Sequence, residues 1–206
     1  MMRFYLIVLI LIFNVSSVST QSIKSYGLRI GSNLSTAIGD LTDERYIASF
    51  MIGASLTFEI DEHLSFRPEI CYSNKGYKYT HEEPAVSYII ESEFTFRYFE
   101  MPFLFVYSLG ENFNFIGGAY IEFFSEGTIQ DPSYYYGEID IDSEYVNSPG
   151  YGLVLGVEYC TDYAMFGIRY SMGLSKIYNS SSSDLKHQVF QFTIGFNVPI
   201  GKKEKK

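Results

Sequence analysis

Apolar and polar residues alternate along most of this chain. The alternation is clearest near the C-terminus, where every second residue of 189–198 is apolar: Phe190, Phe192, Ile194, Phe196 and Val198. The positions between them are Gln191, Thr193, Gly195 and Asn197. Because successive side chains of a β-strand point to opposite faces, this pattern predicts a strand with one apolar and one polar face.

Seven further segments have strand character. They are residues 26–34, 52–60, 64–73, 94–109, 113–125, 151–159 and 166–175. Segments 94–109 and 113–125 are apolar on both faces, so their orientation stays open. Each of the eight strands reaches the roughly 9–11 residues that cross a bilayer at a tilt.

The connections between these strands alternate between short and long. The short ones are residues 61–63, 110–112 and 161–162, and the long ones fall near 35–45, 80–92, 127–148 and 179–187. Short turns at one rim and long loops at the other are typical of outer-membrane barrels.

The N-terminus predicts export. Arg3 precedes an apolar run over residues 4–13, and small polar residues follow over 16–20. The run is about half the roughly 20 residues of a membrane helix, which favours a signal peptide over a permanent anchor. We expect a signal peptide over 1–20 with cleavage near Ser19 or Thr20, a barrel over 21–199 and a charged tail over 200–206.

Two kinds of closed barrel fit a period of two. A soluble barrel of lipocalin type buries its apolar face, whereas a membrane barrel turns that face toward lipid. Here the apolar face is continuous and aromatic, in a chain with 19 Tyr and 18 Phe, and water contact would be unfavourable. We therefore expect an all-β, eight-stranded antiparallel up-and-down transmembrane β-barrel in a bacterial outer membrane.

Five segments resemble a known family. They are YGLRIGSNLS from Tyr26, LSFRPEICYSNKG from Leu64, YFEMPFLFVYSL from Tyr98, GYGLVLGVEY from Gly150 and FGIRYSMGLSKIY from Phe166. Together they look like the outer-membrane β-barrel domain family called PorT-like, which is common in Bacteroidetes-type bacteria. The resemblance implies an eight-stranded barrel without a catalytic motif, and one namesake is linked to protein secretion.

Charged residues fall on the face expected to point into the barrel. They are Arg29, Arg67, Arg97, Arg169, Glu59, Glu69, Glu100, Glu122 and Glu158. An eight-stranded barrel holds side chains rather than a pore, so these charges should pair. We expect a closed network of salt bridges, with Arg67 beside Glu69 and Arg169 facing Glu158. A proton or solute path is the alternative.

The two cysteines are expected to remain unpaired, although an exported protein meets an oxidising compartment. Cys71 lies about eight residues up its strand, while Cys160 ends its strand beside a short turn. The resulting height difference of roughly 20 Å far exceeds the Cα separation of about 7 Å that a disulfide allows.

Two loops contain candidate chemistry. Residues 179–187 combine serines with Asp184 and His187, which suggests either nucleophilic catalysis or a solvated loop tip. Loop 127–148 contains Asp131, Glu138, Asp140, Asp142 and Glu144 with Tyr134, Tyr135, Tyr136 and Tyr145. Calcium binding, a protein or glycan contact, an unspecialised loop and an extended strand pair all remain open. Neither His63 nor His81 has evident metal-ligand spacing.

These features favour a non-enzymatic protein. We expect a structural outer-membrane barrel, or one whose long loops bind an envelope or surface protein or glycan. Its constant partner is outer-membrane lipid, and we expect no cofactor, metal or catalytic residue. The formal net charge of −9 argues against a nucleic-acid partner. The alternatives are an enzyme acting on outer-membrane lipid, with His187 and the nearby serines as candidates, and an accessory of a protein secretion system.

Overall fold

The computed structural model describes residues 23–40, 44–83, 88–132, 137–162, 164–181 and 183–200. The predicted signal peptide over 1–20 lies outside these residues, as does most of the predicted tail. None of the helices in the described part of the chain is long and apolar enough to cross a membrane.

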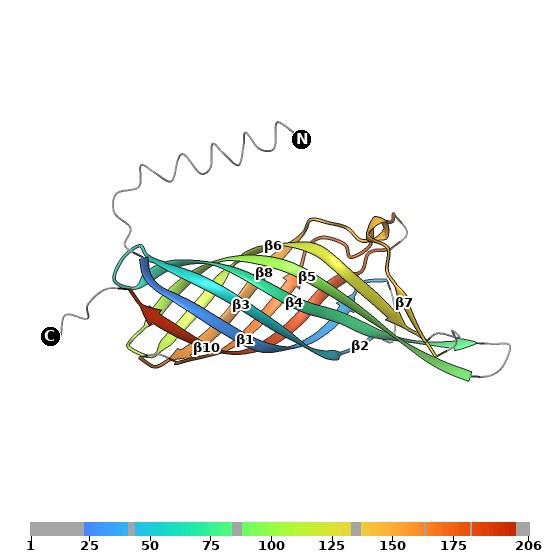
Figure 1. Ribbon diagram of the computed structural model, residues 1–206, viewed down its shortest axis with the longest axis horizontal. Helices are drawn as coiled ribbons and strands as arrows, with labels where there is room; N and C mark the ends of the chain where they lie inside the picture. The colour runs from blue at the N-terminus through green and yellow to red at the C-terminus, as the bar shows by residue number, and fades with distance from the viewer. Residues whose placement is uncertain are drawn as a thin grey trace, which may run out of the picture.

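A ring of eight long antiparallel strands forms the molecule (Figure 1). They are β1 (Ile23–Ile38), β3 (Ile47–Glu59), β4 (Leu64–Glu83), β5 (Tyr88–Leu109), β6 (Phe113–Gln130), β8 (Gly150–Cys160), β9 (Ala164–Gly173) and β10 (Lys186–Pro199). Each pairs with the next in sequence, and β1 pairs with β10 to close the ring. The predicted up-and-down barrel is confirmed.

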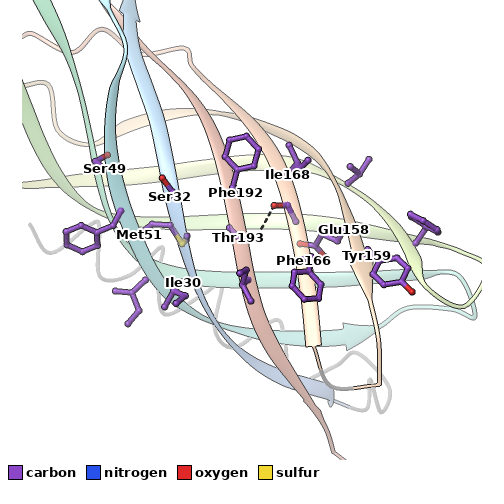
Figure 2. A pocket seen from close by; sticks show the side chains of 17 residues that line it. Ile30, Ser32, Ser49, Met51, Glu158, Tyr159, Phe166, Ile168, Phe192 and Thr193 are labelled. Atoms are coloured by element: carbon purple, nitrogen blue, oxygen red, sulfur yellow. Dashed lines mark hydrogen bonds between the residues drawn. The ribbon is translucent and has the colours of Figure 1, made fainter.

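The outer wall of the barrel is apolar, as the alternation predicts. Leu28 is 65% exposed and Phe196 is 63% exposed, and the alternate residues between such positions point inward. Figure 2 shows part of this wall, where Ile30, Ile168 and Phe192 border a shallow hollow. A water-soluble barrel would not expose so large an apolar area, so the wall is built to face hydrocarbon.

The short connections are tight turns at one end of the barrel, where β1 begins and β10 ends (Figure 1). Asp61 Oδ1 accepts hydrogen bonds from the backbone N–H groups of His63 and Leu64, each at 2.8 Å. These bonds favour the charged carboxylate and lower the pKa of Asp61. In the next turn Gly110 has a φ of 69°, a conformation that glycine adopts without strain.

At the opposite end, several strands are longer than predicted. β4 continues to Glu83 and β5 starts at Tyr88, so most of the predicted 80–92 connection is paired strand. The pair projects beyond the barrel together with the end of β6, which continues beside β5 to Gln130 (Figure 1). Two short strands extend this sheet at its edges. β2 (Glu44–Arg45) pairs with β4, and β7 (Glu138–Asp140) pairs with β6. A short sheet therefore stands on the long-loop rim.

Candidate functional site

The first candidate site is a group of buried charges within the barrel, which we call the arginine cluster. It comprises Arg29, Arg67, Arg169, Glu69 and Glu158. Its nitrogen–oxygen distances run from 2.6 Å for Arg67–Glu158 to 3.6 Å for Arg29–Glu158. The side chains come from β1, β4, β8 and β9, so the cluster joins opposite walls of the barrel. The predicted Arg67–Glu69 and Arg169–Glu158 pairs are confirmed.

A second group, the lysine cluster, consists of Lys75, Glu100 and Glu122. Lys75 Nζ lies 2.5 Å from Glu100 Oε2 and 2.6 Å from Glu122 Oε2. The ammonium also lies over the Tyr120 ring, 4.6 Å from its centroid. Sequence reasoning missed Lys75, although it has the same parity on β4 as Arg67 and Glu69. The predicted strand ended at residue 73, two residues before Lys75.

The net charges of the two clusters are opposite and sum to zero. The arginine cluster has one more cation than anion, and the lysine cluster has one more anion than cation. A buried charge is tolerated when it is paired and hydrogen-bonded. Four basic and four acidic groups therefore fill the lumen, which supports the predicted network rather than an open water-filled channel.

Two predicted inward charges were placed wrongly. Arg97 lies on the outer wall, where its Nη1 is 2.9 Å from Glu126 Oε1. The buried residues of β5 are even-numbered on both sides of this position, as Phe96 and Glu100 show, so the odd-numbered Arg97 points outward. Glu59 has inward parity, but it ends β3 at the short-turn rim and is exposed to solvent there.

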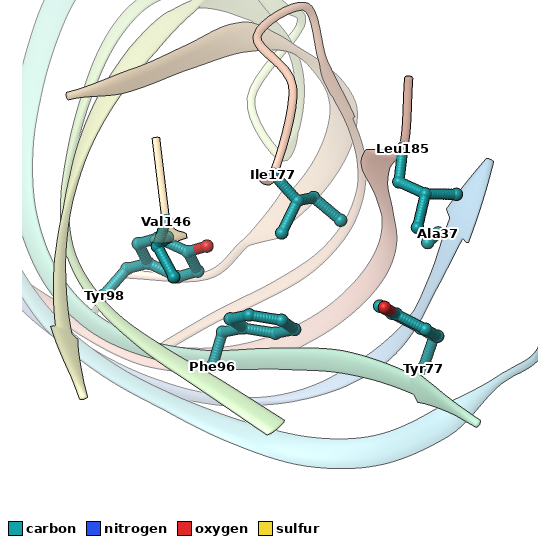
Figure 3. Packing of buried hydrophobic residues seen from close by; sticks show 7 residues of the cluster. All are labelled: Ala37, Tyr77, Phe96, Tyr98, Val146, Ile177 and Leu185. Atoms are coloured by element: carbon teal, nitrogen blue, oxygen red, sulfur yellow. The ribbon is translucent and has the colours of Figure 1, made fainter. Parts of the chain in front are cut away.

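A set of buried apolar residues closes the lumen at the long-loop end. This hydrophobic cap comprises Ala37, Tyr77, Phe96, Tyr98, Val146, Ile177 and Leu185. Figure 3 shows Ile177 and Leu185 pointing from loop backbone toward Phe96 and Tyr77 on the strands. The backbone N–H of Ile177 donates to the carbonyl of Leu185 at 2.7 Å, which fixes the loop across the opening.

The predicted catalytic grouping does not assemble around His187. This residue belongs to β10 and is buried in the lumen, where Nε2 lies 3.1 Å from Tyr98 Oη. Ser180 and Ser181 are exposed on the loop before β10, and Ser182 lies outside the described residues. The imidazole ring instead packs edge-on against Phe96 and Tyr98. The loop was predicted to run to residue 187, but the strand begins at Lys186.

Loop 127–148 is partly strand. Glu138 and Asp140 lie in β7 opposite Gln130 and Thr128, which confirms the extended strand pair. Asp131 is buried and accepts a hydrogen bond from Ser92 Oγ at 2.7 Å, and Asp142 accepts one from the backbone N–H of Glu144. No group of three metal-ligating side chains occurs among the described residues. Tyr134, Tyr135 and Tyr136 fall outside them.

Cys71 and Cys160 are both free thiols. Cys71 is buried in the lumen within 4.0 Å of Glu69 Oε2, whereas Cys160 is half-buried near the short-turn rim and contacts Asn114 Nδ2 at 3.2 Å. The two thiols therefore have different surroundings, and neither takes part in a disulfide.

Comparison with protein families identifies one match. The model of a family described as outer membrane protein beta-barrel domain matches residues 16–179. Nothing in the match singles out the PorT-like, Bacteroidetes-type subgroup. No curated protein matches this chain.

Solved structures share the architecture. Neisserial surface protein A, NspA, is 13% identical, with 83% of this chain and 96% of that chain aligned at a TM-score of 0.55. The attachment invasion locus protein Ail of Yersinia pestis is also 13% identical, with 86% of this chain and 100% of that chain aligned at a TM-score of 0.50. At such low identity the likeness concerns the fold.

Proposed function

Because this chain belongs to the outer membrane protein β-barrel domain family and resides in the bacterial outer membrane, we propose that it binds an envelope or surface partner through its long-loop rim. One observation carries the proposal. Ion pairs fill the lumen and apolar side chains cap it, so the interior that the described residues enclose offers no binding space. The paired strands that project beyond the long-loop rim instead form an ordered surface outside the barrel.

The orientation supports this assignment. In outer-membrane barrels the short turns face the periplasm and the long loops face outward. The projecting parts of β4, β5 and β6, with β2 and β7 at the edges, are then presented to the cell exterior. Exposed Tyr145 lies beside them on the loop before β8. Aromatic side chains at such sites are enriched in protein interfaces.

The enzymatic alternative has less support. An enzyme acting on lipid needs its nucleophile and base within hydrogen-bond reach of one another and of the substrate. His187 faces the lumen and bonds to Tyr98, away from both the outer wall and the exposed serines. Mutating His187→Ala and profiling lipid A and phospholipids by mass spectrometry should therefore show no change.

Site-specific photo-crosslinking in intact cells tests the proposed function. A photoreactive phenylalanine analogue at exposed Glu144, on the long-loop rim, should give a discrete adduct with a protein or glycan. The same analogue at lipid-facing Phe192 is the matched control and should label lipid. If both positions give lipid adducts alone, the rim has no macromolecular partner and the proposal is wrong.

A further inference from the structure

A pocket of about 470 Å³ lies at the long-loop end, next to the hydrophobic cap. Phe94 and Ile129 of the projecting sheet form one side, and Ile141, Tyr145 and Tyr178 of the loops form the other. Phe94, Ile141 and Tyr178 also pack against the cap. The cap therefore supports the apolar wall of the pocket.

The walls are held by hydrogen bonds and do not depend on a ligand for their position. The backbone N–H of Ile141 donates to the carbonyl of Gly127 at 2.8 Å, and that of Asn179 donates to the carbonyl of Tyr145 at 2.8 Å. The hydroxyls of Tyr77 and Tyr178 are 2.9 Å apart. A preformed pocket binds without a large ordering penalty.

The charged side chains that line the pocket are negative. Asp140 and Asp142 line it, and none of the described lining residues is Lys or Arg. Lys176 of the neighbouring loop and Lys186 at the start of β10 have their ammonium groups 3.6 and 3.8 Å from Asp184 Oδ1. The whole chain has a formal charge of −9, which adds to the negative potential. An anionic ligand is disfavoured here.

We propose that this pocket binds a cationic side chain with an apolar stem, the lysine or arginine of a polypeptide partner. The inference rests on the proposed function and names the partner's chemistry. Aromatic rings attract an ammonium or guanidinium group through their faces, and Asp140 and Asp142 provide the opposite charge. The isoleucines contact the methylene stem, which Lys and Arg bury readily.

Methyl NMR on the intact protein in nanodiscs of zwitterionic lipid tests this inference. The probe is benzylammonium, with benzyl alcohol and benzoate as its neutral and anionic analogues. Benzylammonium should shift the δ1-methyl signals of Ile129 and Ile141 saturably, and the two analogues should bind about fivefold more weakly or not at all.

Matched variants test whether the carboxylates of Asp140 and Asp142 cause the preference for a cation. The double substitution Asp140→Asn and Asp142→Asn should remove the preference for the cation, and asparagine at 142 keeps a cap for the short helix Ser143–Tyr145. Glu138→Gln, in the same strand as Asp140 but outside the pocket, should leave binding unchanged.

Equal binding of benzylammonium and benzyl alcohol, or unchanged selectivity in the double variant, would overturn the inference, as would the absence of saturable shifts. A discrete crosslink from Glu144 together with any of these results means that the rim has a partner but this pocket does not select a cation. Selective benzylammonium binding without a crosslink supports the pocket and argues against the macromolecular partner.

Discussion

Lys75 supplies the positive charge of the lysine cluster, in the half of the lumen nearer the long loops. It contacts both Glu100 and Glu122, and the described residues offer these carboxylates no other salt bridge. The arginine cluster is different, because Glu69 and Glu158 each contact three guanidinium groups. Loss of one cation should therefore have unequal effects in the two clusters.

The first prediction compares Lys75→Met with Arg67→Met. Lys75→Met leaves two buried carboxylates without a cation and should destabilise the barrel by about 3–5 kcal/mol. Arg67→Met should cost less, because Arg29 and Arg169 still contact Glu69 and Glu158. Arg97→Met on the outer wall should change stability by less than about 1 kcal/mol.

Urea unfolding in lipid vesicles measures the free energy of unfolding of the three variants and so tests this ranking. The triple variant Lys75→Met, Glu100→Gln and Glu122→Gln is a further control, since it removes the unpaired charge and should recover part of the loss. Equal effects of Lys75→Met and Arg97→Met would show that the lysine cluster is not buried as described.

The second prediction concerns the thiols. Cys71 and Cys160 should both be alkylated when denatured, unreduced protein from the outer membrane is analysed by mass spectrometry, because their different positions leave no partner within disulfide distance. A linked peptide containing Cys71 and Cys160 would show that the strand register is different.

The strands illustrate how far the sequence predicts this fold. Alternation identifies the outward faces of β1, β8, β9 and β10, because each combines apolar residues on one face with small or polar residues on the other. It fails at Arg97, since β5 is apolar or aromatic on both faces, and the pattern alone does not show that the even positions of this strand point inward.

The ends of the strands were harder to predict than their centres. Residues 74–83 mix polar and aromatic side chains, and the hydrophobic alternation that marks a spanning strand stops there. The pairing of β4 with β5 nevertheless continues to Glu83 and Tyr88. Lys75, His187 and the pocket between the loops depend on such extensions, so sequence reasoning missed their arrangement.

The third prediction uses the lipid-facing side of β9. Ile168 is near the middle of this strand and 52% exposed, so Ile168→Arg should destabilise the barrel by about 2–4 kcal/mol in a bilayer. Tyr151→Arg is the control, because Tyr151 is exposed near the long-loop end of β8, where the same change should cost about 0–1 kcal/mol. Equal losses in vesicle-based unfolding would contradict the proposed membrane depth.

At the scale of the whole molecule, the barrel is closed at two levels. The ion-pair clusters occupy its interior, and the hydrophobic cap covers the long-loop end. The loops that supply part of the cap also line the pocket with neighbouring residues, so the loops that close the lumen also shape the surface offered to a partner. This arrangement suits recognition at the cell exterior better than passage of solutes.

Single-channel recording of the purified, refolded protein in planar bilayers tests this central claim most directly. With the lumen filled and capped, the protein should insert without giving steady conductance at any applied potential. A refolded sample whose band shifts on boiling confirms that the recorded protein is a folded barrel. Stable, ion-selective steps from that sample would contradict a closed lumen and favour a solute path instead.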